Sequence, residues 1–144
     1  MAIVSFAVRT TGAGSASAAW EIRTDSATRA RLLELGLFLA VGTASQYALG
    51  RPAAGGVTPT TPQDFLAEDE TPVGAGKLQS ALAWATAPTV PANFFRRWSG
   101  PATIGSGVIW TFPKGLLIPV SGFLVLWNIA ANSVVDAYAV LDRE

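Results

Sequence analysis

Hydrophobic and polar residues alternate along much of the chain, and the alternation is clearest near the C-terminus. In the run 123–129 every second residue is Phe, Val, Trp or Ile, and in the run 134–141 one face is wholly apolar while the other is mixed. A period of two places alternate side chains on opposite faces of a β-strand. The short Ala-Ala-Asn-Ser joint between the runs predicts a C-terminal hairpin. Strands from earlier in the chain must cover so apolar a hairpin, since an uncovered one would aggregate.

The same pattern predicts further strands earlier in the chain. They are expected at 3–10, 18–24, 45–51, 77–85, 92–99 and 107–112, with a short edge segment at 116–119. Stretches rich in Gly, Ser or Pro separate them, among them 11–17, 113–115 and 120–122, and predict turns. About eight or nine short strands divided by turns are typical of a β-sandwich or a barrel.

The segment 29–41 fits two kinds of structure. Its Leu, Ala, Arg and Glu residues are good helix formers. However, Leu33, Leu35, Leu37, Leu39 and Val41 form an unbroken odd-numbered face, and Gly36 in the middle would cost a helix about 1 kcal/mol relative to Ala. We therefore predict a long strand.

The amino-acid composition changes at 52–76, where prolines, glycines and acidic residues are concentrated. Proline cannot donate to a ladder and glycine weakens one, so this segment is expected to be mostly a long loop. Loops of this length in a small domain tend to be functional or disordered. Apolar residues such as Phe65 and Leu66 favour an arm that packs on a neighbouring subunit over a solvated linker.

The composition favours one domain that takes part in an assembly. A chain of 144 residues is long enough for a single β domain spanning 1–144 with a substantial core. Half of its residues are hydrophobic and 14% are charged, which is below the quarter that is usual for soluble domains. A mean hydropathy of +0.37 fits either a compact domain with an Ala-rich surface or, as we favour, a homo-oligomeric subunit with its apolar surface covered by other copies.

Membrane insertion and secretion are not expected. The apolar segment 32–41 is short and contains Glu34, and 116–131 is interrupted by polar residues, Gly and Pro, so neither has the length and character of a transmembrane helix. The N-terminal segment lacks the basic region and the apolar length of a signal peptide.

Charge and residue usage exclude several kinds of chemistry. The formal net charge is zero, so no electrostatic footprint for nucleic acid is present. The chain has no Cys and no His, which removes disulfides, thiolate catalysis, the usual metal ligands and the commonest general base. We expect no enzyme activity, no catalytic residues, no cofactor and no bound metal.

The acidic residues Asp64, Glu68, Asp69 and Glu70 lie close together in the long loop. Their carboxylates could hold a calcium ion, but the spacing matches no EF-hand loop. A solvated acidic loop is the commoner explanation. A glycosidase would need two carboxylates on opposite sides of a sugar-sized cleft. Four acidic residues on one loop support a glycosidase site less than they support a calcium site.

The run 94–98, Phe-Phe-Arg-Arg-Trp, mixes aromatic and basic side chains. As a strand it would place Phe94, Arg96 and Trp98 on one face and Phe95 and Arg97 on the other. Such a run could be an ordinary strand or a platform that stacks a sugar or a base. Aromatic residues and Arg are enriched at subunit contacts, so we favour an interface. The predicted interface residues are Phe65, Leu66, Phe94, Phe95, Arg96, Arg97 and Trp98.

Glycine-rich spots such as Gly55-Gly56 and Gly105-Ser-Gly107 do not have the spacing of a phosphate-binding loop and do not lead into a clear helix. We interpret them as turns. Serine nucleophiles would have to recruit Lys77 or Lys114, since His is absent, and no motif supports such a dyad.

A succession of short motifs carries a resemblance to a known class of protein. They are Glu-Ile-Arg at 21–23, Leu-Gly-Leu-Phe-Leu at 35–39, Leu-Gly-Arg-Pro at 49–52, Phe-Phe-Arg-Arg at 94–97, Ile-Trp-Thr-Phe-Pro at 109–113 and Leu-Val-Leu-Trp-Asn at 124–128. In this order they resemble small structural proteins of tailed-phage virions. In overall type the chain is similar to the small β-sandwich, or jelly-roll, decoration (cement) proteins of phage capsids, which usually form trimers.

The resemblance implies an all-β, single-domain antiparallel sandwich of jelly-roll type with one long Pro/Gly-rich loop. It implies a homotrimer that is assembled in the host cytoplasm, binds the outer surface of a bacteriophage capsid in the virion and stabilises contacts between major capsid protein subunits. A tail or receptor-binding carbohydrate-binding sandwich, with Trp84 or Trp98 stacking a sugar, is the alternative. A β-sandwich hydrolase has the weakest support.

Overall fold

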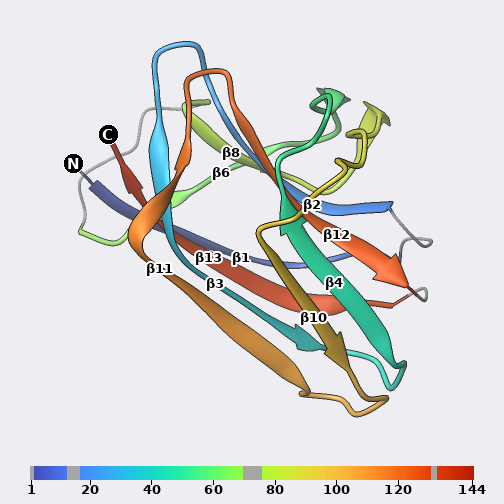
Figure 1. The fold of residues 1–144 in the computed structure, drawn as a ribbon. Helices are drawn as coiled ribbons and strands as arrows, with labels where there is room; N and C mark the ends of the chain where they lie inside the picture. The colour runs from blue at the N-terminus through green and yellow to red at the C-terminus, as the bar shows by residue number, and fades with distance from the viewer. Residues whose placement is uncertain (1, 13–16, 70–75, 131–132) are drawn as a thin grey trace.

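A computed structural model describes residues 2–12, 17–69, 76–130 and 133–144 of the chain. These residues form an antiparallel β-sandwich in which two sheets pack against each other (Figure 1). The predicted all-β fold class is confirmed. Within the described ranges the regular elements are all strands, and no helix there is long and apolar enough to cross a membrane.

The first sheet has five strands in the order β11-β3-β13-β1-β7. Their bounds are β1 (Ala2–Arg9), β3 (Ala30–Leu39), β7 (Leu66–Ala67), β11 (Gly107–Ile118) and β13 (Val135–Arg143). Strands β1 and β13, which lie at the two ends of the chain, pair side by side along their whole lengths (Figure 1).

The second sheet has six strands in the order β10-β4-β12-β2-β8-β6. Their bounds are β2 (Ser17–Thr24), β4 (Ser45–Gly50), β6 (Gln63–Asp64), β8 (Leu78–Ala81), β10 (Arg96–Gly100) and β12 (Phe123–Ala130). A separate ribbon is formed by β5 (Val57–Pro59) and β9 (Trp84–Thr86).

The long strands pair from the two ends of the chain inward. Strand β1 pairs with β13, β2 with β12, β3 with β11 and β4 with β10. In addition β13 pairs with β3, and β12 pairs with β4, which completes each sheet. Eight strands wound in this order, with alternate pairs in opposite sheets, form a jelly roll.

The core lies between the two sheets and is rich in leucine. Strand β3 contributes the buried residues Leu32, Leu35, Leu37 and Leu39, and the facing sheet contributes Trp20 among others. Burial of each such side chain stabilises the fold by about 1.5–3 kcal/mol. The rows of leucine and aromatic residues therefore hold the sandwich together.

The ambiguous segment 29–41 is a strand, as predicted, but its buried face shifts by one residue. Leu35, Leu37 and Leu39 face the core as expected, whereas Leu32 takes the place of Leu33. The register shows the reason, because β13 residues Val140 and Leu141 pair with Glu34 and Leu32, which leaves Leu33 as an extra residue in a bulge.

The predicted C-terminal hairpin is wrong, because β12 and β13 lie in different sheets. Strand β12 pairs with β2 and β4, while β13 pairs with β1 and β3. Residues 131–132 of the expected joint lie outside the described residues. Alternation identified both strands but contained no information on their partners.

The bounds of two further predicted elements also differ from the prediction. The expected turn at 113–115 is an irregularity inside the long strand β11, where the pairing with β3 jumps from Thr111 to Leu116. The expected single strand at 77–85 is divided into β8 and β9, which belong to different sheets.

The predicted loop at 52–76 contains three short strands, β5, β6 and β7. Strand β7 pairs with β1 at an edge of the five-stranded sheet, and β6 pairs with β8 at an edge of the six-stranded sheet. The described part of this segment thus closes one side of its own sandwich, and a contact with a neighbouring subunit stays a prediction. Residues 70–75 of the loop lie outside the described residues.

Candidate functional site

The predicted interface residues lie on two opposite edges of the sandwich and in its core. Leu66 is 64% exposed in β7, at the edge that β6 and β7 form. Phe65 is only 3% exposed, and its ring stacks on that of Trp20 with 6.4 Å between centroids. Its assignment to a surface contact is corrected accordingly, because Phe65 is a core residue. The run 94–98 leads into β10 at the other edge.

The run 94–98 alternates as predicted from Arg96 onward. Trp98 packs against the core and Arg96 lies over the ring of Phe112, so both point to the inner side of the sheet. Arg97 lies on the other side, over the ring of Phe94 at 5.4 Å. The placement of Phe94 differs from the prediction because β10 begins only at Arg96.

The basic side chains at this edge stack on aromatic rings of the same chain. Guanidinium carbons lie 4.8 Å from the ring centroid for Arg96 over Phe112 and 4.9 Å for Arg51 over Phe95. Each exposed cation–π contact contributes about 0.5–1 kcal/mol. The mixed run is therefore organised by intrachain stacking, and it leaves Phe95 37% exposed.

A pocket of about 390 Å³ lies at this edge. It is lined by Arg96, Phe112, Pro113, Lys114, Gly115 and Leu116. The irregularity in β11 forms it, since Gly115 has a φ of 71° and the pairing with β3 is interrupted there. The lining combines an apolar surface with two cationic side chains.

A second pocket, of about 260 Å³, lies near the opposite edge. It is lined by Phe6, Val8, Thr60, Thr61, Gln63, Ser80, Leu82 and Ala83. Its side chains are apolar or neutral, and Phe6, Val8 and Leu82 belong to the margin of the core.

The acidic residues of the predicted loop lie around β6 and β7, except that Glu70 lies outside the described residues. Asp64 accepts hydrogen bonds through Oδ1 from the amide of Gly76, at 3.0 Å, and from Nε2 of Gln79, at 3.1 Å. Glu68 and Asp69 are exposed. In the described ranges no three acidic residues gather as a metal site would require.

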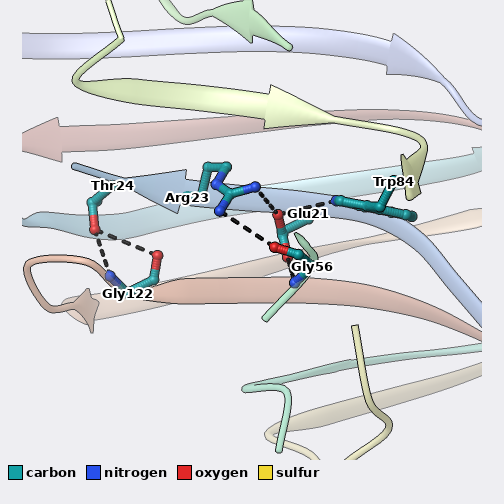
Figure 2. A network of polar contacts seen from close by, with 6 residues as sticks. All are labelled: Glu21, Arg23, Thr24, Gly56, Trp84 and Gly122. Atoms are coloured by element: carbon teal, nitrogen blue, oxygen red, sulfur yellow. Dashed lines mark hydrogen bonds and ion pairs between the residues drawn. The ribbon is translucent and has the colours of Figure 1, made fainter. Parts of the chain in front are cut away.

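A buried carboxylate, Glu21, forms a polar network that the sequence did not indicate (Figure 2). Glu21 is 0% exposed. Its Oε2 accepts a hydrogen bond from the amide of Gly56 at 2.8 Å, and its Oε1 accepts one from Nε1 of Trp84 at 3.1 Å. Arg23 pairs with the same carboxylate at 3.3 Å and lies over the ring of Phe123.

The network fastens the β5/β9 ribbon, through Gly56 next to β5 and Trp84 in β9, onto the outer face of the six-stranded sheet. Trp20 and Ile22 of β2 face the core, so Glu21 points to the opposite face. Because polar residues alternate with apolar ones in 18–24, the sequence indicated a solvent-exposed Glu21. The alternation in 18–24 is the same as in an ordinary surface strand, because the residues that cover Glu21, namely Gly56 and Trp84, lie far along the chain.

The pair Gly55-Gly56, interpreted as a turn, serves as a close packing site. A Cβ atom on Gly55 would lie 2.4 Å from the ring of Phe123, and one on Gly56 would lie 2.3 Å from the ring of Trp84. Neither glycine has a positive φ, so the requirement for glycine here is lack of space. The missing side chains let the backbone approach the Glu21 carboxylate.

The outer face of the five-stranded sheet is accessible, whereas that of the six-stranded sheet is covered around Glu21 by Gly56 and Trp84. Ala7, Tyr138, Gly36 and Ile109 form one row across β1, β13, β3 and β11. Ile109 is 51% exposed, and the ring of Tyr138 covers Gly36. This row is a flat apolar strip on a sheet surface.

Polar groups border this strip. The hydroxyl of Tyr138 donates to Oε2 of Glu34 at 2.8 Å; burial raises the pKa of Tyr138, and Glu34 raises it further. Arg9 and Asp136 form a two-pronged ion pair next to the strip, at 2.7 and 2.8 Å. An apolar centre with a polar rim is the anatomy of a protein-binding surface.

No protein-family model, curated protein or solved structure matches the chain.

Proposed function

We propose that this protein is a structural virion protein that binds the outer surface of a phage capsid and stabilises contacts between major capsid protein subunits. The observation that carries the proposal is the asymmetry of the sandwich. One outer sheet face is covered around Glu21 by the β5/β9 ribbon, while the other presents the accessible strip of Ala7, Tyr138 and Ile109. The jelly roll, a rigid fold found among viral capsid domains, supports the same role.

The strip is suited to a flat protein partner. It has little relief, because Gly36 at its centre carries no side chain and the Tyr138 ring lies over it. Burial of apolar surface, at roughly 25 cal/mol per Å², would supply the binding energy. The bordering groups Arg9, Asp136 and Glu34 would set orientation by charge complementarity.

The experiment adds the purified protein to cognate capsids assembled without it and measures co-sedimentation and the temperature of capsid disruption. We expect the wild-type protein to bind and to raise that temperature. Ile109→Asp places a charge in the strip and should weaken binding by about tenfold or more. Val57→Asp is the matched control, since Val57 is 55% exposed on β5, outside this face.

Failure of the folded wild-type protein to bind capsids would contradict the proposal. Equal binding by the Ile109→Asp and Val57→Asp variants would remove the strip as the contact surface.

A carbohydrate-binding tail component is the alternative, and it receives less support from the placement of the two tryptophans. The Nε1 of Trp84 is bonded to Glu21, and the ring of Trp98 packs over Gly100 and beside Tyr47. Both rings are thus occupied by intrachain contacts. Specific glycan binding that is lost in Trp98→Ala would favour this alternative.

A further inference from the structure

The zero net charge of the chain conceals a separation of charge between the two lateral edges of the sandwich. One edge is formed by β10 and β11, which contact each other, and the other by β6 and β7. Arg96 and Arg97 lie in β10 and Lys114 lies in β11. Arg51 joins them, because its Nη2 donates to the carbonyl of Leu117 at 2.7 Å.

These four cations have no carboxylate partner among the described residues. The ion pairs in that part of the chain involve Arg9, Arg23, Arg29 and Arg31 instead. The β10/β11 edge therefore carries uncompensated positive charge next to the pocket of about 390 Å³.

The β6/β7 edge carries the opposite charge around a protruding apolar side chain. Asp64 lies in β6, Leu66 in β7, and Glu68 directly after β7, with its amide bonded to the carbonyl of Ile3 at 2.9 Å. The two donors to Asp64, Gly76 and Gln79, are uncharged. Lys77 lies on this side too, but near Asp25, whose amide donates a hydrogen bond to the carbonyl of Lys77.

The two edges are matched in apolar character as well as in charge. Leu66, 64% exposed, is flanked two residues away on each side by a carboxylate. The pocket has an apolar lining of Phe112, Pro113 and Leu116, accompanied by the cations Arg96 and Lys114. The pocket, of about 390 Å³, is an open depression against whose apolar lining an exposed leucine side chain can be buried.

We propose that copies of this chain associate head to tail, with Leu66 of one copy inserted in the pocket between Arg96 and Lys114 of the next. Asp64 and Glu68 then face the basic edge, and water leaves an apolar pocket. An exposed apolar residue that fits a pocket elsewhere on the same molecule makes a heterologous contact. Such contacts close into rings or continue as open chains, according to the rotation between copies.

This contact between copies adds to the proposed structural role, and its biological purpose depends on that proposed function. Its test uses the purified chain without capsids, so that failure of self-association and failure of capsid binding are separate results. Sedimentation velocity over a range of protein concentrations measures the association, at low and at high salt. We expect oligomers at low salt whose dissociation constant rises as salt screens the charges.

Leu66→Ala tests the apolar insertion. It should weaken association by about tenfold or more, as expected for a central anchor. Val57→Ala is the matched control, because Val57 is 55% exposed outside both edges. A wild-type protein that stays monomeric at millimolar concentration, or a Leu66→Ala variant that associates like wild type, would overturn the proposal.

Charge reversal tests the pairing of the two edges. Arg97→Glu with Lys114→Glu removes the net positive charge of the β10/β11 edge, and Asp64→Lys with Glu68→Lys makes both edges basic; each variant alone should weaken association by about tenfold or more. The four substitutions combined place new carboxylates on the β10/β11 edge and new ammonium groups on the β6/β7 edge, and should recover association. Circular dichroism confirms folding of each variant, and a folded fourfold variant that stays monomeric would contradict the charge pairing.

Discussion

At the scale of single residues, the most informative side chain is Glu21, whose carboxylate is wholly buried yet fully engaged. It accepts hydrogen bonds from Gly56 and Trp84 and pairs with Arg23. A buried carboxylate is costly to desolvate, and it is tolerated here because partners come from both the strand and the covering segment. The network thus makes the position of the β5/β9 ribbon depend on the folding of the six-stranded sheet, which contains Glu21.

Glu21→Gln keeps the shape of the side chain but removes its charge and turns an acceptor into a donor. At least one of its two hydrogen-bond donors, the Gly56 amide and Nε1 of Trp84, then loses its acceptor, and Arg23 loses its ion pair. We therefore expect a loss of about 3 kcal/mol in the free energy of unfolding. Urea denaturation followed by tryptophan fluorescence measures the loss. Glu68→Gln is the control, since Glu68 is exposed, and its effect should stay within about 0.5 kcal/mol. Equal effects of the two substitutions would contradict this role for Glu21.

At the scale of elements, the pairing of the first and last strands places charged residues opposite each other. Arg9 of β1 pairs in register with Asp136 of β13, and the guanidinium donates two hydrogen bonds to the carboxylate. The hydrogen bond from Arg9 lowers the pKa of Asp136, and the charge of Arg9 lowers it further, against the effect of desolvation. Both side chains are well exposed, so salt screens the contribution.

This pairing predicts a dependence of stability on acid pH. Because the pKa of Asp136 is lower in the folded state, its contribution is present above the unfolded value of about 3.9 and is lost as pH falls through the folded value. Asp136→Asn should therefore flatten the decline in stability below about pH 4. Urea denaturation at a series of pH values, at low and at high salt, measures this. An unchanged acid decline in the variant would show that the pair does not contribute.

At the scale of the whole molecule, the jelly roll depends on contacts between the ends of the chain. Strand β13 lies between β1 and β3 in the five-stranded sheet and contributes Val135, Ala137, Ala139 and Leu141 to the core. Its position is therefore central although its sequence position is terminal. Without β13 the sheet loses its ladders with both β1 and β3, together with four residues of the core.

Removal of residues 134–144 should abolish cooperative folding. The truncated chain would leave β1 and β3 without their shared partner, and their exposed edges would favour aggregation. Near-ultraviolet circular dichroism and thermal unfolding measure the loss. Deletion of Glu144 alone is the control, because it removes one terminal backbone hydrogen bond to Arg29 and partly exposed ion pairs with Arg29 and Arg31, which contribute little. Cooperative unfolding of the longer truncation would contradict the topology.

The sequence by itself determined that the long alternating segments are strands, but not always which face meets the core: in β12 it is Leu124 and Leu126 that do so, and not Val125 and Trp127 as the alternation predicted. The alternation in 123–129 and 134–141, and the odd-numbered leucines of 29–41, correspond to β12, β13 and β3. Only the tertiary structure decided their partners, which is why the expected hairpin is two strands of different sheets. Side-chain period is a local property, whereas pairing depends on residues far along the chain.

The candidate surfaces show the same division. Composition indicated that Leu66 and the run 94–98 take part in contacts, but only the fold placed them on opposite edges and moved Phe65 to the core. The burial of Glu21, too, was decided by Gly56 and Trp84, which lie 35 and 63 residues away in sequence. A local sequence pattern indicates whether a residue favours burial or solvent. Which residues surround it is decided only by packing between segments that are far apart in sequence.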